Sequence, residues 1–136
     1  MLRVETLHHV SLPIRDLAVS KAFYSGVLEL PEIERPAFNF PGAWYAVGDR
    51  VLHLIVGEES TFRTGKGIDS HDAHFAIRVA SYQAALTHLR AKGYAADATD
   101  AMRKVREHPT GSAGFPQMYL LDPDRNVIEI NAAALD

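Results

Sequence analysis

Four residues that could bind a metal ion stand within apolar, strand-like stretches of the chain. They are three histidines and one glutamate: His9, His53, His74 and Glu129. Side chains alternate between the two faces of a strand, so each of these polar groups is expected to face away from its apolar neighbours. Three imidazoles and a carboxylate form a nitrogen and oxygen donor set suited to zinc, nickel, iron(II), cobalt or manganese. The chain has no cysteine, so sulfur ligands and thiolate nucleophiles are excluded.

The elements that would position these residues follow one plan in the first part of the chain. Residues 7–14 (LHHVSLPI) are predicted to form a strand, Asp16 to cap a helix, and residues 17–29 to form that amphipathic helix. Three strands are predicted after it, at residues 31–35, 43–47 and 51–56. The first half therefore has the order βαβββ.

The same plan restarts after a connector over residues 57–70. A strand is predicted at residues 73–79, a helix at 82–92 with Ser81 as its N-cap and Gly93 as its stop, and a short strand at 94–96. Two further strands are predicted at 117–121 and 126–131, joined by the turn Asp122-Pro123-Asp124-Arg125. The second half is thus also βαβββ.

The two halves share a register that places the four candidate ligands in equivalent pairs. A shift of 65 positions sets His9 on His74, and a shift of 76 positions sets His53 on Glu129. If two such halves pack side by side, four ligands in matching register would line one cavity. Duplication and parity together indicate a metal site, although a single strand histidine is more often a solvated one.

Substrate-pocket residues are expected beside the ligands and in the long loop of the second half. By the same alternation of side chains along a strand, which we call the parity rule, Ser11 should lie beside His9, with Val51 and Ile55 beside His53. The loop over residues 99–115 has the length of a lid, and its basic residues could hold an anionic group. Arg103 is one of these basic residues. An aromatic pocket wall could be furnished by Phe38, Phe40, Trp44, Tyr45, Phe115 and Tyr119.

Composition excludes several functional classes. The chain has 136 residues, 14 basic and 17 acidic side chains and a net charge of -3, so no basic face for nucleic acid is expected. No apolar run approaches the length of a membrane span, and no secretory signal is expected. A cytoplasmic protein that binds a small molecule, and forms a homodimer as most oligomers of this size do, is the expectation.

The stretch HHVSLPIRDLAVSKAFYSGVLEL resembles the opening of vicinal oxygen chelate proteins, which have a His-bearing strand, an Asp, and FY followed by VLGL. His53 in VLHLIV, His74 in AHFAIRV and Glu129 in LLDPDRNVIEIN match the other three ligand positions of that superfamily. The resemblance spans nearly the whole chain. It implies an α+β fold in which two βαβββ modules, about 5–57 and 72–133, form a cupped mixed sheet around a metal within one domain, 1–136.

The resemblance also implies an activity, that of a glyoxalase-type lyase or isomerase. In this superfamily a divalent ion binds two neighbouring oxygens of the substrate, and Glu129 would serve as the base that moves a proton. This chain departs from the pattern at Glu29 and Arg125, where glycine is common. His53 replaces a carboxylate or amide ligand of glyoxalase I enzymes, which puts a reaction with symmetric carboxylate bases in doubt.

Three alternatives within the same superfamily remain open. Ring-cleaving extradiol dioxygenases use iron(II) with two histidines and one glutamate, in which case His53 would not be a metal ligand. Fosfomycin-type thiol transferases have a three-ligand manganese site and also leave His53 unexplained. Metal-free drug-binding resistance proteins need no ligands, so the presence of all four argues against that class.

Overall fold

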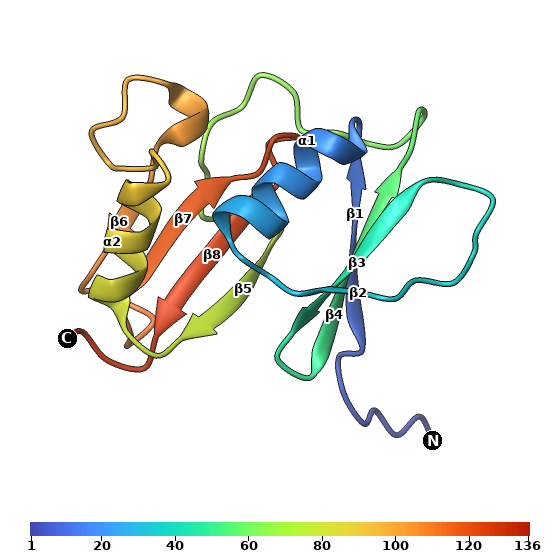
Figure 1. Cartoon of the computed structure of the whole chain (residues 1–136). Coiled ribbons are helices and arrows are strands. Elements are labelled where there is room, and N and C mark those ends of the chain that lie inside the picture. The colour runs from blue at the N-terminus through green and yellow to red at the C-terminus, as the bar shows by residue number, and fades with distance from the viewer. The chain divides into compact units, whose positions relative to one another are not determined.

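The computed structural model describes residues 1–136, and the chain divides into two compact units, 1–61 and 62–136. The first unit contains, in chain order, β1 (His9–Ile14), α1 (Leu17–Lys21), η1 (Ala22–Val27), β2 (Glu32–Ile33), β3 (Gly42–Val47) and β4 (Arg50–Val56) (Figure 1). The second contains β5 (His74–Val79), α2 (Tyr82–Ala91), η2 (Ala101–Arg103), β6 (Arg106–His108), β7 (Gln117–Leu121) and β8 (Val127–Ala132). The predicted repetition of βαβββ is confirmed.

Each unit builds a four-stranded mixed sheet of the same topology. The strand orders are β1-β4-β3-β2 and β5-β8-β7-β6. In each sheet the first and last strands of the unit pair in parallel, and the remaining neighbours pair antiparallel. The parallel pairs place Ser11 opposite His53 and Ala76 opposite Glu129, so the two halves have equivalent registers.

In the first unit, one face of the sheet packs beneath the helical segment. Tyr45, Leu52 and Leu54 are buried on this face. The ring of Tyr24 from η1 lies 5.9 Å from the ring of Tyr45, whose hydroxyl lies 2.8 Å from the Ser25 hydroxyl. Since side chains alternate, His53 and Trp44 belong to the opposite face.

In the second unit, α2 lies alongside the sheet (Figure 1). Its buried side chains are Tyr82, Leu86 and Leu89, and the Tyr82 hydroxyl donates to the carbonyl oxygen of Gln117 at 3.1 Å. The opposite face of the sheet bears Glu129 and is covered in part by Ile68 and Met102, which pack against a core of Tyr119, Leu121 and Val127.

The helices begin where the sequence predicts. The Asp16 side chain accepts a hydrogen bond from Val19 N at 3.0 Å, and the Ser81 side chain accepts one from Ala84 N at 2.9 Å. The first helix differs from its prediction, because an α-helical turn passes into a π-helix at Ala22 and ends at Val27 rather than residue 29. None of the helices is long and apolar enough to cross a membrane.

The expected short strand at residues 94–96 is wrong. Ala95 makes only an isolated bridge with Lys104, and the second strand of the second unit is β6, which pairs with β7. The loop over residues 99–115 therefore contains η2 and β6. A three-residue apolar stretch gives little periodic signal, and pairing with β7 decides where the strand lies.

The two positions at which the sequence departs from the expected glycine pattern have a left-handed backbone. Glu29 has φ 53° and Arg125 has φ 66°. A side chain other than glycine is strained in this region. Both substitutions therefore leave the turn geometry in place at a cost in stability.

Candidate functional site

His74 and Glu129 form a direct pair in the second unit. His74 Nε2 lies 3.1 Å from Glu129 Oε2. The other ring nitrogen, Nδ1, lies 2.6 Å from the carbonyl oxygen of Asp72, which can only accept a hydrogen bond. Nδ1 therefore bears a proton. Nε2 and Oε2 face one another, and both atoms are of types that bind divalent metal ions.

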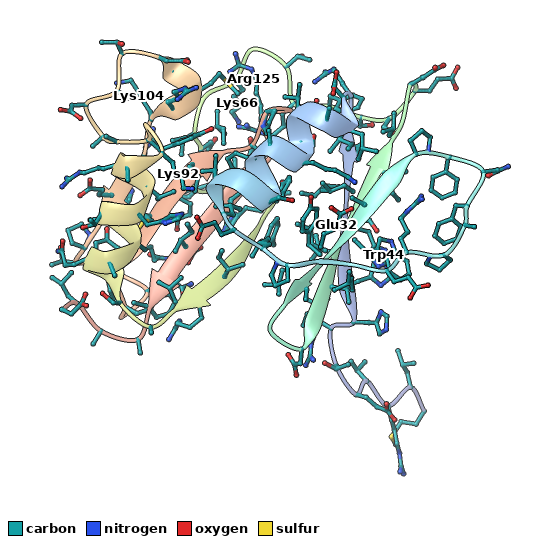
Figure 2. The ribbon with its side chains drawn as sticks, in the orientation of Figure 1. Glu32, Trp44, Lys66, Lys92, Lys104 and Arg125 are labelled. Carbon is teal, nitrogen blue, oxygen red and sulfur yellow. The ribbon has the colours of Figure 1, made fainter.

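Asp72 is itself held in place by Arg63. The Arg63 guanidinium donates to Asp72 Oδ2 at 2.8 Å, to the Arg125 carbonyl at 2.6 Å and to the Gly67 carbonyl at 2.8 Å. Hydrogen bonds from Lys66 and Arg63 lower the pKa of the Asp72 carboxyl. Figure 2 shows Lys66 and Arg125 near one another in this region. The network fixes the backbone of Asp72, whose carbonyl oxygen contacts His74 Nδ1.

The carboxylate of Glu129 is buried and oriented by two amide side chains. Its Oε1 accepts hydrogen bonds from Asn131 Nδ2 at 2.8 Å and from Gln117 Nε2 at 3.0 Å. Burial raises the pKa of Glu129, but the hydrogen bonds from Asn131, Gln117 and His74 outweigh it, and the pKa lies below its ordinary value. Glu129 is therefore ionised, and Oε2 is the oxygen left to face His74.

Two further residues continue this network outward. The Arg78 Nε group donates to Asn131 Oδ1, and the guanidinium carbon of Arg78 lies 4.9 Å from the centre of the Phe115 ring. None of Gln117, Asn131 and Arg78 was identified as a site residue from the sequence. The parity rule could have found the first two, since Gln117 pairs with Asn131 and both share the face of Glu129.

Tyr119 lies next to the pair, as expected for a pocket residue. It is opposite Glu129 in the β7–β8 register, and its ring lies 5.7 Å from that of His74. Burial and the neighbouring Glu129 raise the pKa of the Tyr119 hydroxyl. Arg103 lies elsewhere, with its guanidinium 5.7 Å from the Tyr94 ring and Nε 3.8 Å from Asp100.

In the first unit, His9 and His53 lie together on the face opposite the helix. Their ring centroids are 4.2 Å apart and their planes differ by 16°. The other side of the His53 ring stacks on Trp44 at 4.2 Å, with planes 3° apart. Burial and then the nearby His9, His8 and Arg35 lower the pKa of His53, which favours its neutral form.

This stacked arrangement constrains what His53 can bind. An ion on an imidazole nitrogen lies in the plane of the ring, about 2.1 Å from the nitrogen. Because the two rings are stacked in nearly parallel planes, no single point lies in both planes about 2.1 Å from a nitrogen of each ring. His9 and His53 therefore cannot hold one ion as placed, and His53 would have to leave Trp44 to join His9 as a ligand.

The pocket candidates of the first unit lie on the same face as these rings. Ser11 is exposed and pairs with His53, while Val51 is half-buried and pairs with His9. Ile55 is half-buried and lies opposite Gly42 of β3. The parity argument thus identifies neighbours of His9 and His53 correctly, but the contact between His53 and Trp44 is a feature of side-chain packing.

The donor atoms of the second unit fit a metal ion. Two ligands bound side by side on one ion at about 2.1 Å each are separated by roughly 3.0–3.4 Å. The 3.1 Å between His74 Nε2 and Glu129 Oε2 meets this condition without any movement. Neither unit by itself gathers three residues of the ligating types.

The sequence of this chain matches one protein-family model and is similar to one named plant protein. The family model described as Glyoxalase/Bleomycin resistance protein/Dioxygenase superfamily matches residues 6–130. A protein of Arabidopsis thaliana named Glyoxylase I 4 is 30% identical over 131 residues, which cover 95% of this chain and 71% of that protein.

Solved structures share the fold over nearly the whole chain. One is of a protein from Bacillus anthracis described as belonging to the glyoxalase family, with a TM-score of 0.77, 19% identity and coverage of 97% of this chain and 98% of the other. Another is the fosfomycin resistance protein FosX from Listeria monocytogenes, with a TM-score of 0.69, 18% identity and coverage of 98% and 97%. A variant of FosX was solved with Mn(II) and 1S,2S-dihydroxypropylphosphonic acid.

Proposed function

The chain belongs to the glyoxalase/bleomycin resistance protein/dioxygenase superfamily, and from this premise we propose that it is a divalent-metal-dependent enzyme of the glyoxalase type. Its substrate is a small molecule that presents two neighbouring oxygens to the ion. The complex of FosX with Mn(II) and a dihydroxypropylphosphonic acid supports a ligand of this kind.

One observation carries the proposal: His74 Nε2 and Glu129 Oε2 face one another at 3.1 Å, a separation that suits two neighbouring ligands of one ion. The Asp72 carbonyl fixes the proton on Nδ1, and two amides occupy Oε1. Both donor atoms are thus oriented in advance toward the same point, which is the preorganisation that a catalytic ion requires.

We propose that His9 completes the ligand set with His74 and Glu129. A bound divalent ion would supply Lewis acidity, which lowers the pKa of a carbon acid next to the bound oxygens. His53, which the sequence predicts as a fourth ligand, remains a prediction in that role, and its stack on Trp44 favours a place in the wall of the site.

Glu129 is the proposed carrier of the proton. When Glu129 is loosened from the ion, its Oε2 would take the proton from the substrate carbon and return it to the neighbouring carbon or oxygen, which gives an isomerase or lyase outcome. The amide donors on Oε1 keep the group ionised and hold Oε2 in one direction. Tyr119, beside His74, excludes water from this side.

Replacement of Glu129 by Gln tests this role. Gln is isosteric, so the protein should fold, yet it cannot accept the substrate proton. Deuterium incorporation from D2O into an α-hydroxy ketone or the hemithioacetal of a 2-oxoaldehyde should be catalysed by the metal-loaded wild type and lost in Glu129→Gln. Equal exchange by both proteins would contradict the assignment of the base.

A second candidate function is supported by the position of His53. If His53 stays on Trp44, the ligand set is two histidines and one glutamate, as in the iron(II) ring-cleaving dioxygenases that this sequence resembles. Oxygen uptake by the iron(II)-loaded protein with catechols would favour this reaction. Metal analysis of protein purified without added metal separates both enzymes from a metal-free binding protein.

We also propose that the protein acts as a homodimer, since two-fold dimers are the commonest oligomers. Sedimentation equilibrium measures the mass directly. A mass of one chain across the micromolar range would contradict this proposal.

A further inference from the structure

A partly exposed surface of the first unit combines aromatic rings with one arginine. This aromatic–arginine wall comprises Arg35, Phe38, Phe40, Trp44 and His53. The rings of Phe38 and Phe40 stack with centroids 5.0 Å apart, and the Phe38 ring lies 6.2 Å from that of Trp44. Trp44 in turn stacks on His53. Figure 2 shows Trp44 on β3, beside the loop that leads into this strand.

The two phenylalanines are unusual because they remain exposed. Phe38 is 44% exposed and Phe40 is 37% exposed, and they are the two aromatic side chains among the exposed large hydrophobic residues. Isolated exposed apolar residues are common, but a stacked pair continuous with the half-buried rings of Trp44 and His53 is a feature of binding surfaces.

Arg35 has few partners within the protein. Its guanidinium carbon lies 4.7 Å from the centre of the Phe38 ring and 5.0 Å from that of Phe40. Of its five N–H groups, one is seen to donate, from Nη2 to the Phe40 carbonyl at 2.9 Å. The buried Nε group has no hydrogen-bond partner, and no carboxylate pairs with the guanidinium.

The guanidinium lies beside the stacked pair of Phe38 and Phe40, and its Nε is buried. The edge formed by Nη1 and Nη2 is therefore the part left to meet a ligand. An edge of this kind matches a carboxylate, which can accept two parallel hydrogen bonds. The positive charge of Arg35 is also one of the causes that lower the pKa of His53, whose ring stacks on that of His9.

We propose that the aromatic–arginine wall binds the aromatic ring and the carboxylate of a small aromatic acid, so that the substrate of the proposed enzyme is of this class. The ring stacks against Phe38 and Trp44, and the carboxylate pairs with Arg35. The substrate class rests on the proposed function, whereas binding to the wall does not require the metal.

Three probes separate the two parts of the recognition. Phenylglyoxylate has a ring, a keto oxygen and a carboxylate; pyruvate lacks the ring, and methyl phenylglyoxylate lacks the charge. Trp44 is the single tryptophan of the chain, so quenching of its fluorescence reports binding directly. Phenylglyoxylate should quench with saturation and bind at least about tenfold more tightly than either comparison compound.

Variants of Arg35 test the source of the affinity. Arg35→Met should weaken phenylglyoxylate binding about tenfold, in line with the loss of a charge-assisted hydrogen bond, and Arg35→Lys should weaken it less. Arg50→Met, which removes a cation of β4 outside the wall, should bind as the wild type does. Circular dichroism establishes that each variant is folded, and Arg35→Lys serves if Arg35→Met is not.

Binding is measured with metal-free and with zinc-loaded protein, so that the proposed metal-dependent function and the proposed aromatic-acid site can each be contradicted without the other. A wall that binds phenylglyoxylate in metal-free protein supports this inference even if no metal site exists. The inference is overturned if the wild type shows no saturable binding, if pyruvate binds equally well, or if the folded Arg35 variants bind as the wild type does. A change of oligomeric mass in those variants with unchanged binding would assign the wall to a protein interface instead.

Discussion

Replacing His53 by Phe separates the two roles that this residue could have. Phe has no ligating nitrogen but retains a flat ring of similar size. Because the wild-type ring lies 4.2 Å from Trp44 with planes 3° apart, the Phe ring can keep this stack. We therefore expect His53→Phe to bind a divalent ion with the stoichiometry of the wild type.

The size of the stabilising effect follows from the two ring contacts of His53. An aromatic pair contributes about 0.5–1.5 kcal/mol beyond the area that it buries. His53→Ala removes the contacts with both Trp44 and His9, so we expect its free energy of unfolding to fall by roughly 1–2 kcal/mol, whereas His53→Phe should change it by less than about 0.5 kcal/mol.

Urea denaturation followed by the fluorescence of the single Trp44 measures these differences, and equilibrium competition with a chelator measures metal binding. Zinc is suitable because it does not quench fluorescence by itself. If His53→Phe loses the ion as completely as His74→Ala does, His53 is a ligand and the argument from ring stacking is refuted.

Three further predictions concern stability. Asn131→Leu removes a donor from the buried carboxylate of Glu129 and should lower the free energy of unfolding of the metal-free protein by about 1.5–3 kcal/mol in urea denaturation; an unchanged midpoint would contradict the role of this hydrogen bond. Glu29→Gly relieves a left-handed backbone and should raise the unfolding free energy by roughly 0.5–1 kcal/mol, detected as a higher thermal midpoint, while a lower midpoint would count against strain. The hydrogen bond from Lys66 lowers the pKa of Asp69, so the stabilisation of this loop is present above the ordinary pKa of about 3.9 and is lost as the pH falls through the lowered value. Amide hydrogen exchange of residues 66–71 should become faster over that range in the wild type and show no such pH-dependent loss in Asp69→Asn.

The duplicated architecture could be predicted from the sequence because period-two and helical patterns recur in the same order. Strand parity also identified the face that His74 and Glu129 share, since that face depends only on alternation along β5 and β8. The shortest strands were predicted unevenly, because β2 lies within its predicted range whereas the second strand of the second unit is β6 instead of residues 94–96. Their positions depend on pairing with distant strands.

Other features of the site depend on side-chain packing and could not be read from the chain. The stack of His53 on Trp44 joins residues of two strands, and its geometry depends on the rotamers that neighbouring side chains allow. The hydrogen bonds of Gln117 and Asn131 to Glu129 were within reach of the parity rule, but neutral amides are less conspicuous in a sequence than candidate ligands. No pattern in the sequence predicted the π-helix that begins at Ala22.

The metal content of the wild type and of His74→Ala tests the central claim most directly. Each protein is freed of metal, titrated with zinc, nickel, manganese or iron(II), and analysed for ions bound per chain. We expect one saturable site per chain in the wild type and none in His74→Ala, because His74 Nε2, which faces Glu129 Oε2, is a proposed ligand of the ion. Wild-type metal content in His74→Ala, or no saturable site in the wild type with any of these ions, would contradict the proposed enzyme.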